Sequence, residues 1–180
     1  MLLTFTIGAF LVACSADDID KDRVAAAKAA KVTASAPKRG TEGENLAAEF
    51  QLVQMDGSRL SLGELKGQPA VLDFWASWCA PCRYEVPHVN KLADTYGSRG
   101  VRVFGINVRE SQARTESGIK DFGIRYAVAR DVDGKIAQTY KVDGIPKVIF
   151  LDSRGNVRYA GNRLPADYSE RLDALLVERQ

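Results

Sequence analysis

One stretch constrains this chain more than any other: residues 71 to 87, Val-Leu-Asp-Phe-Trp-Ala-Ser-Trp-Cys-Ala-Pro-Cys-Arg-Tyr-Glu-Val-Pro. It opens with an apolar run interrupted only by Asp73, which is typical of a strand buried on both faces in a mostly parallel sheet. After Cys82 the apolar residues recur every three or four positions through Tyr96, which predicts one face of an amphipathic helix. Cys79 is therefore expected where a buried strand leads into a helix N-terminus.

A cysteine in that position is suited to thiol–disulfide exchange. The unpaired amide groups and positive dipole end of a helix can lower a cysteine pKa from ~8.5 into the range ~3.5–7.5, which favours the thiolate. Cys79 is accordingly predicted to be the nucleophile. Cys82 lies one helical turn further on, close enough to attack a mixed disulfide formed on Cys79, and is predicted to be the resolving thiol.

A Cys-x-x-Cys pair can also be half of a zinc site. Zinc usually takes about four ligands, and outside this pair the chain has one further cysteine, Cys14, and one histidine, His88. We therefore expect no metal and no cofactor. The non-enzymatic alternative is a metallochaperone or substrate-binding module that uses the thiols as ligands or not at all.

The segment Trp78-Cys79-Ala80-Pro81-Cys82-Arg83 resembles the active site of TlpA-like thioredoxin-fold protein-disulfide reductases, whose relatives include proteins of cytochrome c maturation. Pro87, Gly144-Ile145-Pro146 and Phe150-Leu151-Asp152 match the family as well, and the resemblance covers roughly residues 46–178. It implies an α/β thioredoxin fold, with a central mixed sheet flanked by helices. Here we expect an N-terminal β-hairpin extension to that sheet.

The resemblance also implies a substrate-binding element. In the thioredoxin fold the pair that matches Ile145-Pro146 has a cis peptide bond and lies against the dithiol. The free backbone groups of Ile145 could then pair with an extended substrate segment. Trp78, directly before Cys79, is expected to bind substrate beside this pair. The alternative is a trans proline that only begins a strand.

Two acidic residues are candidates for the base that removes the proton of Cys82. Asp73 precedes Cys79 by six residues, the place of the buried aspartate of thioredoxin, and an isolated carboxyl there should have a raised pKa. Glu85 follows Cys82 by three residues and matches an acid near the dithiol in the family. The alternatives are a purely structural role for Asp73 and a solvated position for Glu85.

Residues 1–13 carry no charge and are too short for the ~20 apolar residues that span a bilayer, so we interpret them as an export signal. Leu11-Val12-Ala13-Cys14 resembles the lipobox of bacterial lipoproteins, which implies cleavage before Cys14 and lipid on its sulfur. The alternative is an ordinary signal with an incidental cysteine. Residues 14–45 have almost no large apolar side chains and are predicted to be a flexible linker after the lipidated cysteine.

Residues 46–180 are predicted to form one thioredoxin-like domain. Phe50 and Leu52 alternate before the turn dipeptide Asp56-Gly57, and Leu60 and Leu62 resume the alternation, which predicts the hairpin. The other expected elements are a strand over 101–108, helices over 111–122 and 135–140, strands over 148–151 and 157–160, and a final helix over 166–178.

Together these features predict an exported, lipid-anchored thiol–disulfide reductase that faces the periplasm of a bacterial cell envelope. The expected partners are disulfide-containing exported proteins, such as apocytochrome c, and a membrane electron donor of the DsbD or CcdA kind. An oxidase or isomerase is the alternative within the same chemistry. The 25 basic and 23 acidic residues leave a net charge of +2, which argues against a nucleic-acid partner, and we expect a monomer.

Overall fold

Strand β3 (Ala70–Trp75) lies at the centre of the sheet in the computed structural model, which describes residues 47–178, and all six of its residues are buried. It pairs in parallel with β4 (Arg102–Val108) and antiparallel with β6 (Lys147–Leu151). The predicted buried strand is confirmed. The predicted signal, Cys14 and the linker through residue 45 lie outside the described residues.

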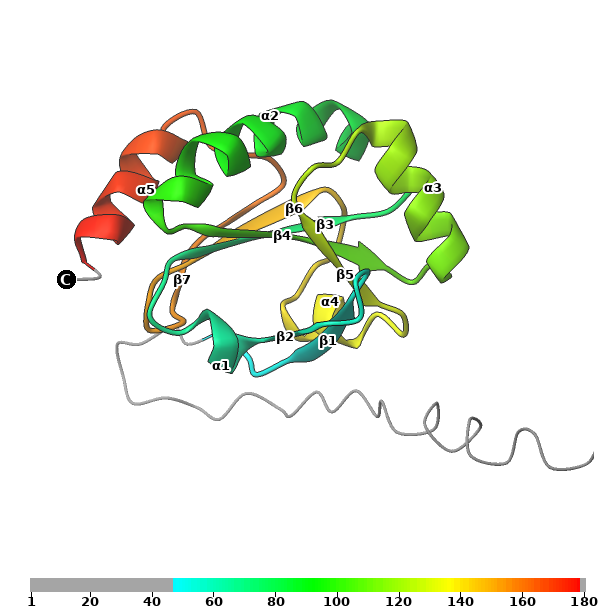
Figure 1. The fold of residues 1–180 in the computed structure, drawn as a ribbon, viewed down its shortest axis with the longest axis horizontal. Coiled ribbons are helices and arrows are strands. Elements are labelled where there is room, and N and C mark those ends of the chain that lie inside the picture. The colour runs from blue at the N-terminus through cyan, green and yellow to red at the C-terminus, as the bar shows by residue number, and fades with distance from the viewer. Residues whose placement is uncertain (1–46, 179–180) are drawn as a thin grey trace, which may run out of the picture. The chain divides into compact units, whose positions relative to one another are not determined.

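The sheet has seven strands in the order β2-β1-β5-β4-β3-β6-β7 (Figure 1). Strands β3, β4 and β5 run parallel to one another, whereas β1, β2, β6 and β7 join by antiparallel pairing. The sheet is therefore mixed, as predicted. The remaining elements are β1 (Gln51–Gln54), β2 (Arg59–Ser61), α1 (Leu62–Leu65), α2 (Ala80–Tyr96), the 3-10 helix η1 (Gly97–Arg99), α3 (Gln112–Phe122), β5 (Ala127–Asp131), α4 (Lys135–Thr139), β7 (Val157–Gly161) and α5 (Tyr168–Val177).

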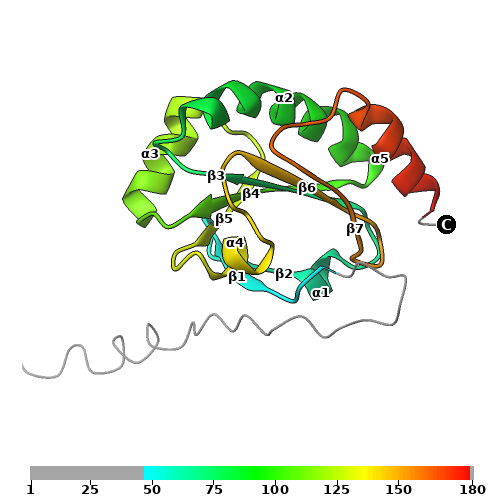
Figure 2. The ribbon, with the colours of Figure 1, turned by 180° about the vertical axis from the view of Figure 1, so that it is seen from behind.

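Helices α2, α3 and α5 cover one face of the sheet, and α4 lies on the other (Figures 1 and 2). Successive side chains of a strand point to opposite faces, so β3 contributes to both layers. Leu72 and Phe74 pack with the hairpin and α4, while Val71 and Trp75 pack beneath the helices. Asp73 lies between Val71 and Trp75 in this alternation, so it faces the helices as well.

Strand β5 is the main element that the sequence did not predict. It pairs with β4 on one side and with the hairpin strand β1 on the other, so it joins the hairpin to the sheet. Its run Ala-Val-Ala-Arg-Asp is short and ends in two charged residues, which hides it from a search for apolar alternation. Within residues 47–178 no helix is both long and apolar enough to cross a membrane.

The hairpin itself is confirmed, but its second strand is shorter than expected. Leu62, predicted to continue the alternation, instead begins α1. Ser61 caps this helix: its Oγ accepts the N–H of Glu64 at 3.3 Å and donates to the Glu64 carboxylate at 2.9 Å. This N-cap pairs one of the amide groups that are free at a helix N-terminus, and it turns the chain out of the strand.

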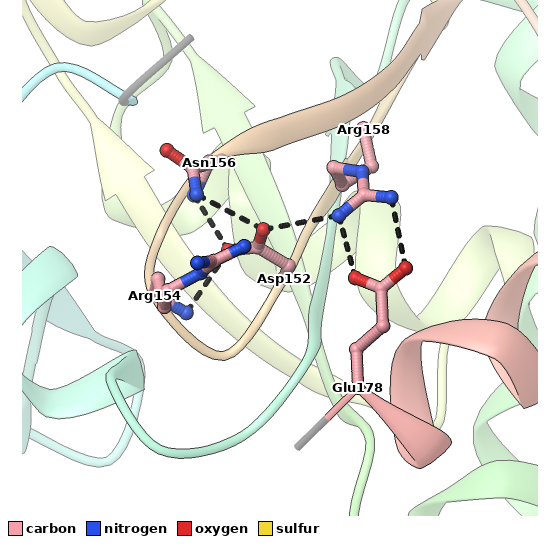
Figure 3. A network of polar contacts seen from close by, with 5 residues as sticks. All are labelled: Asp152, Arg154, Asn156, Arg158 and Glu178. Atoms are coloured by element: carbon pink, nitrogen blue, oxygen red, sulfur yellow. Dashed lines mark hydrogen bonds and ion pairs between the residues drawn. The ribbon is translucent and has the colours of Figure 1, made fainter. Parts of the chain in front are cut away.

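A buried carboxylate holds the turn between β6 and β7 (Figure 3). Asp152 accepts the N–H groups of Arg154 and Asn156 at 2.9 Å each, the side-chain amide of Asn156 at 3.0 Å and the Arg158 guanidinium at 3.3 Å. Burial alone would raise the pKa of Asp152, but these donors hold it below its usual value. Arg158 also pairs with Glu178 at 2.6 Å, so the network links the turn to the end of α5.

Replacing this carboxylate should destabilise the protein. Asp152→Ala leaves the buried amide groups of the turn without an acceptor, and we expect the free energy of unfolding at pH 7 to fall by roughly 2–4 kcal/mol. Arg158→Ala removes only a partly exposed ion pair and should cost about 0–1 kcal/mol. Urea denaturation measures both, and equal losses in the two variants would contradict this account.

Candidate active site

The two cysteines form a disulfide at the junction of β3 and α2, with their Cα atoms 5.3 Å apart. Cys79 is the N-cap residue of α2, and its Sγ accepts the N–H of Cys82 at 3.2 Å. Pro81 lies in the first helical turn, where its missing N–H has no intrahelical partner to lose. The predicted passage from strand to helix is confirmed, and it places the sulfur of Cys79 among the free amide groups of the helix N-terminus.

The surroundings of the disulfide differ sharply in exposure. Cys79 is 3% exposed and Cys82 is 1% exposed, whereas the neighbouring Trp78 is 67% exposed. The Ile145-Pro146 peptide bond is cis, as the resemblance implied, and Ile145 packs against the apolar cluster that contains both cysteines. The structure therefore brings Ile145 together with both cysteines and with Trp78.

A surface pocket of about 370 Å³ adjoins this place. Trp78 and Ile145 line it on the side of the dithiol, with apolar surface from Val108 and Val142. Its polar lining residues are Arg109, Gln138 and Asp143. The pocket thus combines an apolar wall with groups that can bind a polar or charged substrate segment. Among residues 47–178, no group of three or more His, Cys, Asp and Glu side chains is gathered as a metal site requires.

Asp73 is almost completely buried, with 1% of its surface exposed. We expected an isolated carboxyl, and this was wrong: Tyr126 donates its hydroxyl to Asp73 Oδ2 at 2.8 Å. Gly105 makes this contact possible, because a Cβ at that position would lie 2.9 Å from Trp75 Nε1 and 3.0 Å from the Tyr126 ring. Tyr126 belongs to the same apolar cluster as Cys79 and Cys82, so the acid lies in the layer beneath the dithiol.

Burial raises the pKa of Asp73 to about 7. The hydrogen bond from Tyr126 opposes this rise, and the negative charge of Glu85 adds to it. Within the described residues the second oxygen, Oδ1, has no hydrogen-bond partner, which is consistent with a carboxyl that is easily protonated. The expected direction of the shift is confirmed, and the pKa matches that of a group that exchanges a proton near neutral pH.

Glu85 occupies the second turn of α2 and is partly buried. Its Oε1 accepts the N–H of Leu164 at 2.6 Å, so this carboxylate holds the loop between β7 and α5. Its negative charge contributes to the raised pKa of Asp73. The structure therefore relates Glu85 to the site through Asp73, and direct proton exchange with Cys82 stays a prediction.

A third acid near the dithiol escaped the sequence analysis. Glu110 follows β4, and its carboxylate accepts both the backbone N–H and the hydroxyl of Ser77, at 2.7 and 2.5 Å. Ser77 lies two residues before Cys79. A polar residue just beyond the carboxyl end of a parallel strand is the signal that could have indicated Glu110, because ligands and reacting groups gather at that edge of such sheets.

Comparison with known proteins agrees with this architecture. Residues 44–160 match the AhpC/TSA family. The chain belongs to this family. One curated relative is thiol-disulfide oxidoreductase ResA of Bacillus anthracis, which is 32% identical to this chain over 111 residues. The matched part covers 62% of this chain and 64% of the relative. The chain thus spans less than two thirds of the length of that relative.

Solved structures extend the likeness to three dimensions. A putative thiol:disulfide interchange protein DsbE from Chlorobium tepidum is 28% identical, with a TM-score of 0.66, and covers 78% of this chain and 99% of its own. The thioredoxin domain of a thiol-disulfide oxidoreductase from Bacteroides vulgatus has the same TM-score at 19% identity and covers 76% of this chain and 99% of its own. The predicted thioredoxin fold and the predicted kinship with thiol–disulfide oxidoreductases are confirmed.

The raised pKa of Asp73 makes stability depend on pH. The protonated carboxyl stabilises the fold, and this contribution is complete below the unfolded pKa of ~3.9. It is lost as pH rises through the folded pKa of about 7. Its size is ~1.4 kcal/mol for each unit by which the folded pKa exceeds the unfolded one. Asp73→Asn keeps the shape and an acceptor for Tyr126 without a charge. The variant should therefore be more stable than wild type at pH 8 and lose this advantage towards pH 4.

Urea denaturation of the oxidised proteins between pH 4 and pH 8 measures this difference. Glu170→Gln, which changes an exposed carboxylate on α5, is the matched control and should follow wild type. Parallel midpoints for wild type and Asp73→Asn over the whole range would show that the buried carboxyl carries no raised pKa.

Proposed function

We propose that this protein is an exported thiol–disulfide oxidoreductase that reduces protein disulfides through Cys79 and Cys82. The single observation that carries the proposal is the disulfide whose first sulfur caps helix α2. The relatives named thiol-disulfide oxidoreductase support the reaction class. The exposed Trp78 and the partly exposed Ile145 support a protein substrate, because both line a surface pocket beside the buried disulfide.

The reaction begins with the reduced protein. The thiolate of Cys79 attacks one sulfur of the substrate disulfide; a mixed disulfide forms and the other substrate sulfur leaves as a thiolate, which takes a proton from solvent. Asp73 then accepts the proton of Cys82, and the Cys82 thiolate attacks the sulfur of Cys79. The second substrate sulfur leaves and is protonated. Two electrons have passed from the dithiol to the substrate, and the protein disulfide is the product.

The pocket beside Trp78 serves substrate binding in this scheme. An extended segment that carries the target disulfide pairs with the backbone of Ile145, and main-chain hydrogen bonds of this kind are indifferent to the side chains of the substrate. The pocket next to Ile145 then takes a neighbouring substrate side chain, with Arg109 and Asp143 available for charged groups. This arrangement suits several exported proteins, apocytochrome c among them.

The direction of the reaction determines the other partners. The bacterial periplasm is kept oxidising, so a reductase there needs electrons from across the membrane. We propose a membrane donor of the DsbD or CcdA kind, a lipid anchor on Cys14 that keeps the domain near that donor, and a monomeric protein. A reduction potential near that of thioredoxin, about −270 mV, would support reduction, whereas a value near −120 mV would identify an oxidase.

The two cysteines should behave differently. Because Cys79 caps the helix N-terminus, which favours its thiolate, alkylation of the reduced protein at pH 7 should label Cys79 at least about tenfold faster than Cys82. Cys79→Ser should abolish reduction of insulin. Cys82→Ser should instead accumulate mixed disulfides, which non-reducing electrophoresis detects.

Two results would count against this division of roles. Equal labelling of both thiols across the pH range would remove the assignment of Cys79 as nucleophile. Insulin reduction that survives in Cys79→Ser would remove the dithiol mechanism altogether.

The proposed lipid anchor on Cys14 is tested separately. If the mature protein begins at lipidated Cys14, mass spectrometry of the membrane fraction should find diacylglyceryl mass on an N-terminal Cys14, and Cys14→Ser should release the protein from membranes. Ser15→Ala changes the neighbouring residue but leaves the sulfur, so it should stay bound. An unmodified Cys14 thiol in the membrane-bound protein would exclude the lipid anchor.

A further inference from the structure

The redox loop, residues 76–79, joins β3 to α2 and carries the proposed nucleophile at its end. Its second residue, Ser77, makes two bonds to one carboxylate: its N–H donates to Glu110 Oε2 at 2.7 Å and its hydroxyl donates to Glu110 Oε1 at 2.5 Å. Hydrogen bonds to a charged acceptor are stronger than neutral ones, and two from one residue fix orientation as well as distance. The loop is thereby attached to the segment that follows β4, the strand next to β3.

The carboxylate is itself held in place. Asn107 donates its side-chain amide to Glu110 Oε2 at 2.8 Å, and the Thr115 hydroxyl donates to Asn107 Oδ1 at 2.8 Å. Asn107 and Thr115 are fully buried, and Glu110 is 5% exposed. Burial would raise the pKa of Glu110, but the bonds from Ser77 and Asn107 hold it below its usual value. The Glu110 carboxylate therefore carries its negative charge at neutral pH.

Helix α3 confines the loop from a second side. Gly118 packs so closely that a Cβ there would lie 2.9 Å from the Cβ of Ser77 and 2.8 Å from the Trp75 ring. Ser77 is thus enclosed between the carboxylate at the end of β4 and the backbone of α3. Neither sulfur takes part in these contacts, so reduction of the disulfide breaks none of them.

We propose that Glu110 is a positioning residue for thiol–disulfide exchange: by fixing Ser77 it keeps Cys79 at the N-terminus of α2 when the disulfide is open. The oxidised protein has the covalent link to Cys82 as a second constraint on Cys79, and the reduced protein does not. The influence of a helix dipole falls off within the first turn, so a loop that shifts loses stabilisation of the thiolate. This inference rests on the proposed function, in which Cys79 is the nucleophile.

Two substitutions at Glu110 separate position from charge. Glu110→Ala removes every bond to Ser77. Glu110→Gln can keep them all, since its oxygen can accept from Ser77 and Asn107 while its amide donates to the Ser77 hydroxyl. If Glu110 acted through its charge, both variants would make the Cys79 thiolate more favourable and alkylation faster. If it acts by position, Glu110→Ala slows alkylation and Glu110→Gln stays near wild type.

The measurement is the pH dependence of iodoacetamide alkylation of Cys79 in the reduced full chain, followed by peptide mass. We expect about a tenfold slower rate at pH 7 in Glu110→Ala, with its pH profile moved upward by about one unit, because the thiolate fraction changes roughly tenfold per pKa unit. Ser77→Ala, which loses the hydroxyl but keeps the N–H, should slow the rate roughly threefold. This milder variant decides the question if Glu110→Ala does not fold.

Asp152→Ala is the matched control. Asp152 is likewise a buried carboxylate that binds two backbone N–H groups of a turn. Register places it at the other end of the sheet, because Leu151 pairs with Ala70 at the start of β3 whereas Cys79 follows the end of that strand. The control should lose stability and keep the wild-type alkylation profile.

Three results would overturn the proposal. The first is a wild-type alkylation profile in Glu110→Ala or, if that variant is unfolded, in Ser77→Ala. The second is faster alkylation in both Glu110 variants. The third is a slowing in Asp152→Ala equal to that in Glu110→Ala. Failure of the proposed function itself looks different, since wild-type Cys79 would then show no preferential alkylation over Cys82.

Discussion

The burial of β3 on both faces is the constraint on which the rest of the structure depends. A strand without exposed residues divides the domain into two cores, and its end fixes where the redox loop starts. A carboxyl group in or next to this strand has to find donors inside the protein or take up a proton. The chemistry of the site is largely the way in which three carboxylates meet that demand.

The three carboxylates differ in burial and in the hydrogen bonds that they receive. Asp73 receives one hydrogen bond and has a pKa raised to about 7, so it can exchange a proton. Glu110 receives three and stays ionised, so it can hold a loop. Glu85 accepts a loop amide on one side and acts on Asp73 by its charge on the other. The roles proposed for Asp73 and Glu110, proton acceptor and positioning residue, are consistent with this difference in environment.

Local patterns in the sequence predicted the central strand, the helix after it and the place of Cys79 between them, because all three depend on neighbouring residues. The cis bond before Pro146 was implied by family resemblance and not by physics alone. The contacts from Tyr126 to Asp73 and from Ser77 to Glu110 were not predicted, since they join residues 53 and 33 positions apart. Such contacts depend on which strands pair, and β5, which follows Tyr126, was itself missed.

Cys79 and Cys82 are almost completely buried, which limits the molecules that can react with their disulfide. In the oxidised domain a small thiol reaches little of the disulfide, whereas a protein that docks against Trp78 can bring its own cysteine into line with it. Reduction of the oxidised domain is then expected to depend on proteins that dock at this surface. If the protein is exported, as proposed, this dependence would separate its disulfide from unrelated thiols around it.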